Sequence, residues 1–278
     1  MPPFPNAGSF MKPKHEDFGA SWAALERARE VVSNARHIVC FTGAGISAES
    51  GIATYRDPLT GIWAEHDPRT LETASVFRRN PQLVWGWYLW RRQQVTNAQP
   101  NAAHFAVAQL AATGRKVSVI TQNVDDLHER AGSGDVLHLH GSLSTPKCFA
   151  CHRPGTLPQH QMPLPAGGAL VEPPRCERCS GRLRPNVVWY GEDLPSDVWK
   201  SAIASVKSCD VLISVGTSGI VTPAADIPWL ALSSGATVIH VNTEDVSTAE
   251  PNELMLIGKA TEVLLKLFAL VTRAEQPQ

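Results

Sequence analysis

The sequence predicts an α/β fold, a Rossmann-like doubly wound parallel sheet with a smaller zinc-binding and helical module. Three observations predict it. Short β-branched runs alternate with helical segments, a glycine-rich turn follows the first run, and two close cysteine pairs occur late in the chain. A chain of 278 residues, 43% of them hydrophobic, is long enough to bury such a core.

Six apolar runs are expected to be buried parallel strands, because strands covered on both faces carry continuous apolar sequence. These runs are 37–42, 116–121, 135–140, 186–190, 210–215 and 236–241. Helical segments separate most of them, for example 21–33, 81–96, 102–112, 195–207 and 224–232. The alternation predicts a sheet with helices on both faces.

Two stretches interrupt this alternation and are expected to form the smaller module. Residues 51–100 are mostly helical, and residues 146–184 are rich in proline, glycine and cysteine. The larger, nucleotide-binding domain is then expected to comprise 15–50, 101–145 and 185–272, with loose tails at 1–14 and 273–278.

Charge and hydropathy argue against some classes of partner. The net charge is −1, whereas nucleic-acid and membrane-surface binders depend on a basic excess. No apolar stretch is long enough to span a bilayer, and the proline-rich N-terminus lacks the apolar core of a signal peptide. We therefore expect a cytoplasmic protein without direct contact to nucleic acid or membrane. Cys40 and Cys209, in or beside apolar runs, are expected to be buried thiols.

Two cysteine pairs predict a metal site. Cys148 and Cys151 form one pair and Cys176 and Cys179 the other, with 24 residues between the pairs. Two residues between partners let both thiolates of a pair reach one ion, and two pairs supply the four sulfur ligands of a closed tetrahedral zinc site. Two disulfides of a secreted protein are the alternative, which the N-terminus does not support. We expect one structural Zn²⁺ per chain.

A glycine-rich turn follows the first expected strand. Gly43, Gly45 and Ala48 fit the G-x-G-x-x-G/A pattern, in which glycines allow the backbone to approach a pyrophosphate and a helix N-terminus faces the anion. A standard dehydrogenase would carry an acidic residue at the end of the next strand, but that zone holds 55–58 and no strand. The turn therefore predicts a dinucleotide site of another type.

Polar residues also follow two later strands, at the sheet edge where such folds bind ligands. Gly216, Thr217 and Ser218 follow one strand, and Asn242 and Glu244 follow the other. Small residues leave room for a ligand, and hydroxyl groups can meet phosphate or ribose. These residues are candidates for holding the dinucleotide, although ordinary turn chemistry would explain each motif taken alone.

A third cluster carries the candidate chemistry. Gln122, Asn123 and Asp125 end a strand and could hold a carboxamide and a ribose. His140, at the end of the next expected strand, could exchange protons with a ribose hydroxyl near neutral pH. His128 and His138, like most lone histidines, are expected to be structural.

These motifs, in this order, resemble the sirtuin family, and together they span about residues 35 to 270. The matching segments are 43–47, 55–56, 122–125, 140–142, the two cysteine pairs, 188–192, 216–218 and Asn242. The resemblance implies an enzyme that uses NAD to remove acyl groups from protein lysines, releasing nicotinamide and O-acyl-ADP-ribose. Its partners would be NAD and proteins with acylated lysines.

The resemblance also implies roles for particular residues. His140 would be the general base on a ribose hydroxyl, Asn123 and Asp125 would hold the nicotinamide end, and Arg56 would order the cofactor loop. The dinucleotide would be held by Gly43, Ala44, Gly45, Thr217, Ser218 and Asn242. An extended substrate peptide would pair with the backbone of a segment that contains Val188, Tyr190, Gly191 and Glu192.

Tyr88 and Arg91 are the candidate residues for binding the acyl group. They are three residues apart and would share a helix face, where a phenol and a guanidinium can bind a terminal carboxylate. This spacing resembles the sirtuin branch that removes succinyl, malonyl or glutaryl groups. In that branch an alanine precedes the tyrosine by 16 residues, and Glu72 stands there instead. Its charge would oppose a carboxylated chain if it faced the site. We expect a succinyl and malonyl preference with some deacetylase activity.

Two alternatives stay open at this point. A sirtuin-like ADP-ribosyltransferase or NAD hydrolase would cleave the same glycosidic bond with a different nucleophile. A zinc module without enzymatic activity that recruits DNA or protein would also explain the cysteine pairs, although it would not explain His140.

Overall fold

The computed structural model describes residues 19–53, 61–157 and 164–274. Its main element is a six-stranded sheet, parallel throughout, with the strand order β3-β2-β1-β6-β7-β8. The strands are β1 His37–Thr42, β2 Lys116–Thr121, β3 Val136–His138, β6 Val211–Val215, β7 Thr237–Asn242 and β8 Glu253–Ile257. The predicted doubly wound class is confirmed.

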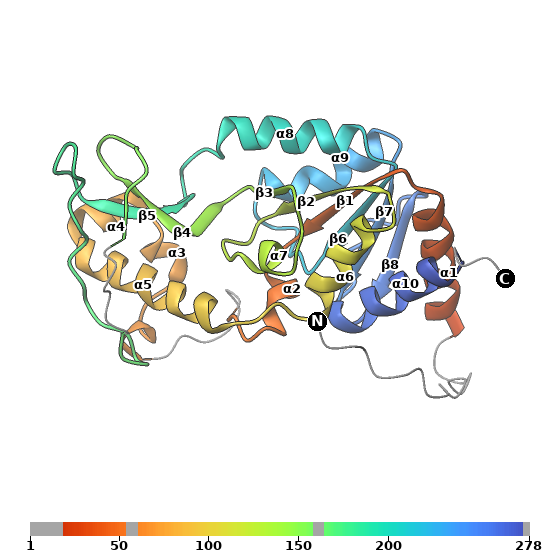
Figure 1. The fold of residues 1–278 in the computed structure, drawn as a ribbon, viewed down its shortest axis with the longest axis horizontal. Coiled ribbons are helices and arrows are strands. Elements are labelled where there is room, and N and C mark those ends of the chain that lie inside the picture. The colour runs from red at the N-terminus through yellow and green to blue at the C-terminus, as the bar shows by residue number, and fades with distance from the viewer. Residues whose placement is uncertain (1–18, 54–60, 158–163, 275–278) are drawn as a thin grey trace.

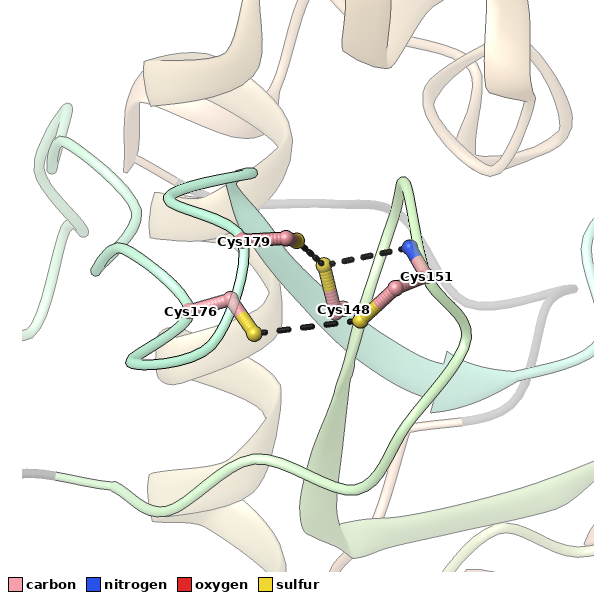
Figure 2. Close-up of side chains that lie close together, drawn as sticks. All are labelled: Cys148, Cys151, Cys176 and Cys179. Atoms are coloured by element: carbon pink, nitrogen blue, oxygen red, sulfur yellow. Dashed lines mark hydrogen bonds between the residues drawn. The ribbon is translucent and has the colours of Figure 1, made fainter.

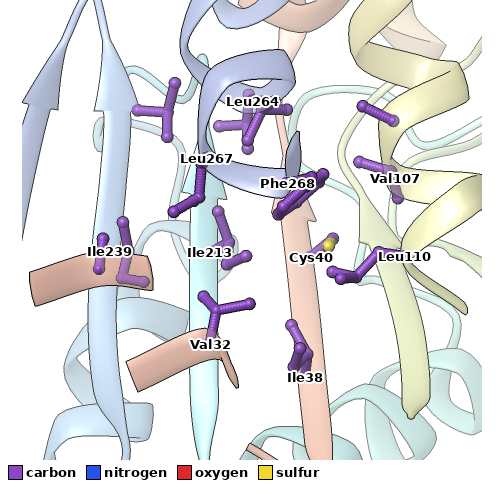
Figure 3. Packing of buried hydrophobic residues seen from close by; sticks show 14 of the residues in the cluster. Val32, Ile38, Cys40, Val107, Leu110, Ile213, Ile239, Leu264, Leu267 and Phe268 are labelled. Carbon is purple, nitrogen blue, oxygen red and sulfur yellow. The ribbon is translucent and has the colours of Figure 1, made fainter. Parts of the chain in front are cut away.

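Helices cover both faces of this sheet (Figure 1). The first face packs against α1 Gly19–Asn34, α6 Ala102–Ala111 and α10 Ala260–Ala274, and the second against α8 Ser196–Lys207 and α9 Ile227–Ser233. Successive strand residues alternate between the faces, so Cys40 lies in the first core and Phe41 in the second. Figure 3 shows Leu267 and Phe268 of α10 packed in the first core. Each such side chain contributes about 1.5–3 kcal/mol by leaving water.

A second, smaller body lies at the other end of the molecule (Figure 1). It contains α3 Pro68–Leu71, α4 Ala74–Arg79, α5 Pro81–Asn97 and a two-stranded antiparallel sheet of β4 Gly141–Cys148 and β5 Leu183–Val187. Side-chain caps start two of its helices, because Thr73 accepts a hydrogen bond from Val76 N and Asn80 from Leu83 N. The remaining short helices are α2 Ala44–Ala48, η1 Gly61–Trp63, α7 Leu127–Arg130 and η2 Ala224–Asp226.

One expected strand is wrong, and two strands, β4 and β8, were not expected. The predicted parallel strand at 186–190 is wrong, because the segment ends an antiparallel strand, β5, of the small sheet. Its partner β4 continues directly into the first cysteine pair, so pairing Leu183 with Cys148 closes the zinc region. β8 was not predicted, because this edge strand is only partly buried and lacks a continuous β-branched run.

The predicted division into two domains stays a prediction. In the structure, β4 runs across the expected boundary at residues 145–146. Among the described residues, no helix is long and apolar enough to cross a membrane.

Candidate active site and zinc centre

The glycine-rich turn lies where β1 and β6 end side by side. Gly43 N donates to Val215 O at 3.0 Å, and Gly45 N donates to Gly216 O at 3.0 Å. A Cβ on Gly45 would lie 2.6 Å from Gly216 Cα, so only glycine permits these two loops to touch. The crossover from β1 to β2 places α6 on the first face of the sheet, and the crossover from β6 to β7 places α9 on the second face. Open α/β sheets bind their ligands at such a point.

An amide and a carboxylate lie beneath that turn and are tied to it. Asn123 Nδ2 donates to Gly43 O at 3.0 Å and to Ser47 Oγ at 3.1 Å. Ser47 Oγ donates to Asp125 Oδ2 at 3.0 Å. Burial raises the pKa of Asp125. The structure thus brings two predicted site residues together through Ser47, which was not predicted as a site residue; its only sequence signal was its place in the glycine motif.

Two histidines form the next layer below. His128 Nε2 lies 3.0 Å from Thr42 Oγ1, and His104 Nε2 lies 3.5 Å from Ser47 Oγ, with the two rings 5.0 Å apart. Burial lowers the pKa of His104 to about 3 and that of His128 to about 4. Both rings are therefore neutral near pH 7, and they support the polar cluster without adding charge.

His140 is held at the junction between the two bodies. Its Nδ1 lies 3.0 Å from Gln122 O, and because a carbonyl only accepts, Nδ1 carries the proton. The lone pair is then on Nε2, as a general base requires. Burial lowers the pKa of His140, which keeps the ring neutral. Gly141 follows at φ +78°, and a Cβ there would lie 2.1 Å from Asn186 O, so the turn after the histidine depends on glycine.

The segment after β5 is hydrogen-bonded to both bodies. Val188 N donates to His140 O at 2.8 Å, and Tyr190 N donates to Glu72 O at 2.9 Å, after which Tyr190 and Gly191 form a turn. A peptide pairing with this segment would therefore use backbone groups other than these two amides.

Glu192 supports this segment through a partly buried ion pair with Arg184. Its carboxylate accepts from both terminal nitrogens of Arg184, which is 2% exposed, and from Trp189 N at 3.0 Å. The guanidinium carbon of Arg184 lies 3.3 Å from the centroid of the Trp189 ring. Arg184 was not predicted to be a functional residue, because an arginine beside prolines and cysteines gives no sign of burial.

The Arg184 pair gives a stability prediction. Glu192→Ala leaves a buried guanidinium without its carboxylate, and we expect a loss of about 3–5 kcal/mol in unfolding free energy by urea denaturation. Glu177→Ala, an exposed acidic residue of the same region, is the matched control and should change stability by less than about 0.5 kcal/mol. Equal stability of the two variants would show that the pair contributes nothing.

Most of the remaining predicted cofactor residues lie at or just after the ends of β6 and β7, along the same sheet edge. Thr217 is buried, and its carbonyl accepts from Asn242 Nδ2 at 2.8 Å, which ties the ends of β6 and β7 together. Ser218 and Glu244 are exposed on the loops that follow. Arg56 lies in 54–60, outside the described residues.

The predicted acyl-group residues have partners within the protein. Tyr88 is 1% exposed and its hydroxyl donates to Leu143 O at 3.0 Å, and burial raises the pKa of Tyr88 to about 12. Arg91 Nη1 lies 3.8 Å from Glu72 Oε1, and these two side chains are 14% and 13% exposed. Glu72 therefore faces Arg91 rather than solvent.

The four predicted zinc ligands converge (Figure 2). All four Sγ atoms lie within 4.8 Å of one another, with Cys148 and Cys179 at 3.5 Å and Cys151 and Cys176 at 3.9 Å. A tetrahedral ion with Zn–S bonds of about 2.3 Å requires sulfurs about 3.8 Å apart, so the cluster fits zinc. Two backbone amides, of Ala150 and Cys151, donate to Cys148 Sγ at 3.4 Å each and favour its thiolate.

Comparison with known proteins shows to which protein family the chain belongs. The Sir2 family matches residues 43–223. NAD-dependent protein deacylase 4 of Pseudomonas syringae pv. tomato is 68% identical over 238 residues, which cover 86% of this chain and 93% of the relative. A crystal structure of a Sir2 homologue–NAD complex has a TM-score of 0.81 at 41% identity, covering 90% of this chain and 94% of the other. The structure of Sir2Af2 bound to a myristoylated histone peptide has a TM-score of 0.66 at 33% identity, covering 91% and 98%.

The chain belongs to the Sir2 family, the sirtuins. Its cofactor is NAD, and the four-cysteine cluster fits that family's structural zinc. Within the family it falls among the NAD-dependent protein deacylases, the name that a Pseudomonas putida relative at 61% identity, over 88% of this chain and 93% of its own, also carries.

Proposed function

We propose that this NAD-dependent deacylase releases nicotinamide and O-acyl-ADP-ribose from acyl-lysine proteins, and that it favours succinyl and malonyl groups while keeping some deacetylase activity. One observation supports the chemistry above all others. The neutral ring of His140 is fixed through Nδ1 on Gln122 O, beside the turn of the dinucleotide site.

Bound NAD supplies an electrophilic ribose carbon and nicotinamide as the leaving group. The chain's own part begins with Asn123 and Asp125, which the Ser47 contacts hold in place for the nicotinamide end. His140 Nε2 accepts a proton from a ribose hydroxyl, and Gln122 O stabilises the resulting imidazolium through Nδ1–H. Gly43, Gly45 and the other residues of the sheet edge position the dinucleotide.

The peptide side of the site is the segment 188–192. It lies within one hydrogen bond of His140, since Val188 N donates to the carbonyl of that residue. The Sir2Af2 complex carries an acylated histone peptide, which supports an acylated protein segment as the partner here. We propose that an extended peptide adds to this backbone, with recognition largely independent of its side chains.

Arg91 is the residue that supports a carboxylated acyl group. It is largely buried on α5, and a guanidinium in such a place binds a carboxylate by paired, charge-assisted hydrogen bonds. Tyr88 lies one turn away, and its hydroxyl would leave Leu143 O to donate to the acyl carboxylate. Arg91 therefore carries most of this part of the proposal.

The test is mass spectrometry of the NAD-derived product, with matched acetyl-, malonyl- and succinyl-lysine peptides. Deacylation gives O-acyl-ADP-ribose in amounts equal to nicotinamide. ADP-ribosylated protein would instead indicate a transferase, and free ADP-ribose without peptide turnover a hydrolase; either result would overturn the proposal.

Arg91→Met tests the acyl preference. Methionine preserves much of the apolar stem but removes the charge, so we expect kcat/KM for the succinyl peptide to fall about 100-fold while that for the acetyl peptide changes by less than about threefold. Arg92→Met, the adjacent position on α5, is the matched control and should keep the preference. Parallel losses for both peptides in Arg91→Met would contradict a carboxylate receptor.

We also propose a cytoplasmic location. None of the six cysteines forms a disulfide, which is the state that reducing compartments maintain, and four of them form the zinc cluster.

A further inference from the structure

Glu72, Trp87 and Arg91 form a compact group that the cofactor and peptide roles do not explain. Glu72 Oε1 lies 3.8 Å from Arg91 Nη1 and accepts a hydrogen bond from Trp87 Nε1 at 3.3 Å. The Arg91 guanidinium carbon lies 5.6 Å from the centroid of the Trp87 ring. A carboxylate of the protein itself is thus held where the proposed receptor would take the carboxylate of an acyl chain.

This group is joined to the peptide segment. The backbone carbonyl of Glu72 accepts from Tyr190 N at 2.9 Å. Burial, and after it the charge of Glu72, raises the pKa of Tyr190, so the field of this carboxylate reaches the segment where the acyl-lysine would lie. Glu72 is therefore placed to influence the substrate as well as Arg91.

We propose that Glu72 is a specificity-determining residue: it is the resident counter-ion of Arg91 and competes with the carboxylate of a succinyl or malonyl group. The inference rests on the proposed function, since it assigns to the same site the residue that limits its preference for carboxylated chains. A neutral acetyl group does not compete for the guanidinium, so turnover of the acetyl peptide does not depend on this ion pair.

The distance between Glu72 and Arg91 determines how the two carboxylates compete. A separation of 3.8 Å is an ion-pair distance but exceeds that of a hydrogen bond, so Glu72 does not hold Arg91 in the bidentate arrangement that a carboxylate ligand can adopt. An incoming acyl carboxylate can therefore make the closer contact. It must do so beside a second negative charge that Trp87 anchors, and like charges in a largely buried place repel strongly.

The experiment uses the zinc-loaded full chain with acetyl- and succinyl-lysine forms of one peptide. Glu72→Gln keeps the shape and the acceptor for Trp87 but removes the charge. We expect kcat/KM for the succinyl peptide to rise about tenfold and that for the acetyl peptide to stay within about twofold. Glu65→Gln, an exposed residue nearby in the chain, is the matched control and should leave the ratio unchanged. Glu72→Ala is the second variant, should the amide perturb the fold, and zinc content and circular dichroism check both.

The double variant Glu72→Gln/Arg91→Met separates this inference from the proposed function. If Glu72 acts through Arg91, the gain from Glu72→Gln disappears in the Arg91→Met background. An unchanged succinyl/acetyl ratio in Glu72→Gln and Glu72→Ala, with a succinyl-specific loss in Arg91→Met, overturns the role of Glu72 and leaves the receptor intact. A gain that persists without Arg91 also overturns competition, and a loss of both activities alike in Arg91→Met removes the receptor itself.

Discussion

His140→Ala should lower kcat by about 10²- to 10⁴-fold, the usual contribution of a positioned general base. The reason lies in its tautomer, because Nδ1 is committed to Gln122 O and Nε2 alone can take the ribose proton. Within the described part of the chain, the contact with Gln122 O is the one hydrogen bond that the His140 side chain makes, so the fold should persist. Steady-state kinetics with the preferred acyl peptide measures the loss, and thermal unfolding checks the fold.

The matched control is His138→Gln, at a histidine that ends β3 two residues before His140. His138 bonds to Glu129 and to Asn123 O through its two ring nitrogens, and glutamine retains a polar side chain there. We expect most of the turnover to survive in this variant. Near-normal turnover in His140→Ala would remove the assigned base.

The pH profile of kcat/KM tests the same assignment without a mutation. The base must be neutral to act, and burial lowers the pKa of His140 from its ordinary value of 6.5. A lowered pKa moves the protonation of the ring to more acid pH. Activity should therefore hold as the pH falls to 6.5 and be lost only below it, whereas an acid limb centred above 6.5 would contradict a buried base.

Loss of zinc should have the largest effect on the fold. Structural Zn²⁺ in small sites is worth about 10–16 kcal/mol of apparent binding free energy, more than most domains have in total stability. Cys148 ends β4 and pairs with Leu183 at the start of β5, so a bound ion would close the sheet that carries both Gly141 and the segment before the backbone proposed to bind the peptide. Without it, we expect the smaller body to unfold and deacylation to cease.

Cys148→Ser is the variant that tests this effect. We expect metal analysis to fall from one zinc per chain to well below one, with a loss of near-ultraviolet circular dichroism from the tryptophans of the smaller body. Cys209→Ser is the matched control, because Cys209 lies under the main sheet and only donates to Val206 O, as a serine can. Full zinc content and activity in Cys148→Ser would show that the cluster is not a required metal site.

The main sheet could be predicted because its central strands have a recognisable sequence pattern. β1 and β6 are buried along their whole length, and burial on both faces requires an unbroken apolar run. β8 lies at the edge and is only partly buried, so its sequence resembles other short apolar stretches. The run at 186–190 was apolar for a different reason, since Trp189 packs against Phe77 of the smaller body.

Some residues of the candidate site could likewise be predicted from the sequence, and others could not. The glycines and histidines of the site could be predicted from the sequence, because they stand at the ends of recognisable strands. The position of Glu72 could not, because which way a side chain points from the turn between α3 and α4 depends on how those helices pack on α5. The burial of Arg184 likewise follows from the fold of the residues around it. The sequence lists such groups, and only tertiary packing decides which of them meet.

The hydrogen bond from Val188 N to His140 O has a consequence for the alignment of the reactants. It joins the segment proposed to carry the peptide to the very residue that bears the imidazole, and it exists in the protein alone. A peptide that docks on this segment would thereby be set in register with the proton acceptor before any chemistry starts. Part of the entropic cost of bringing the lysine and the base together has been met during folding.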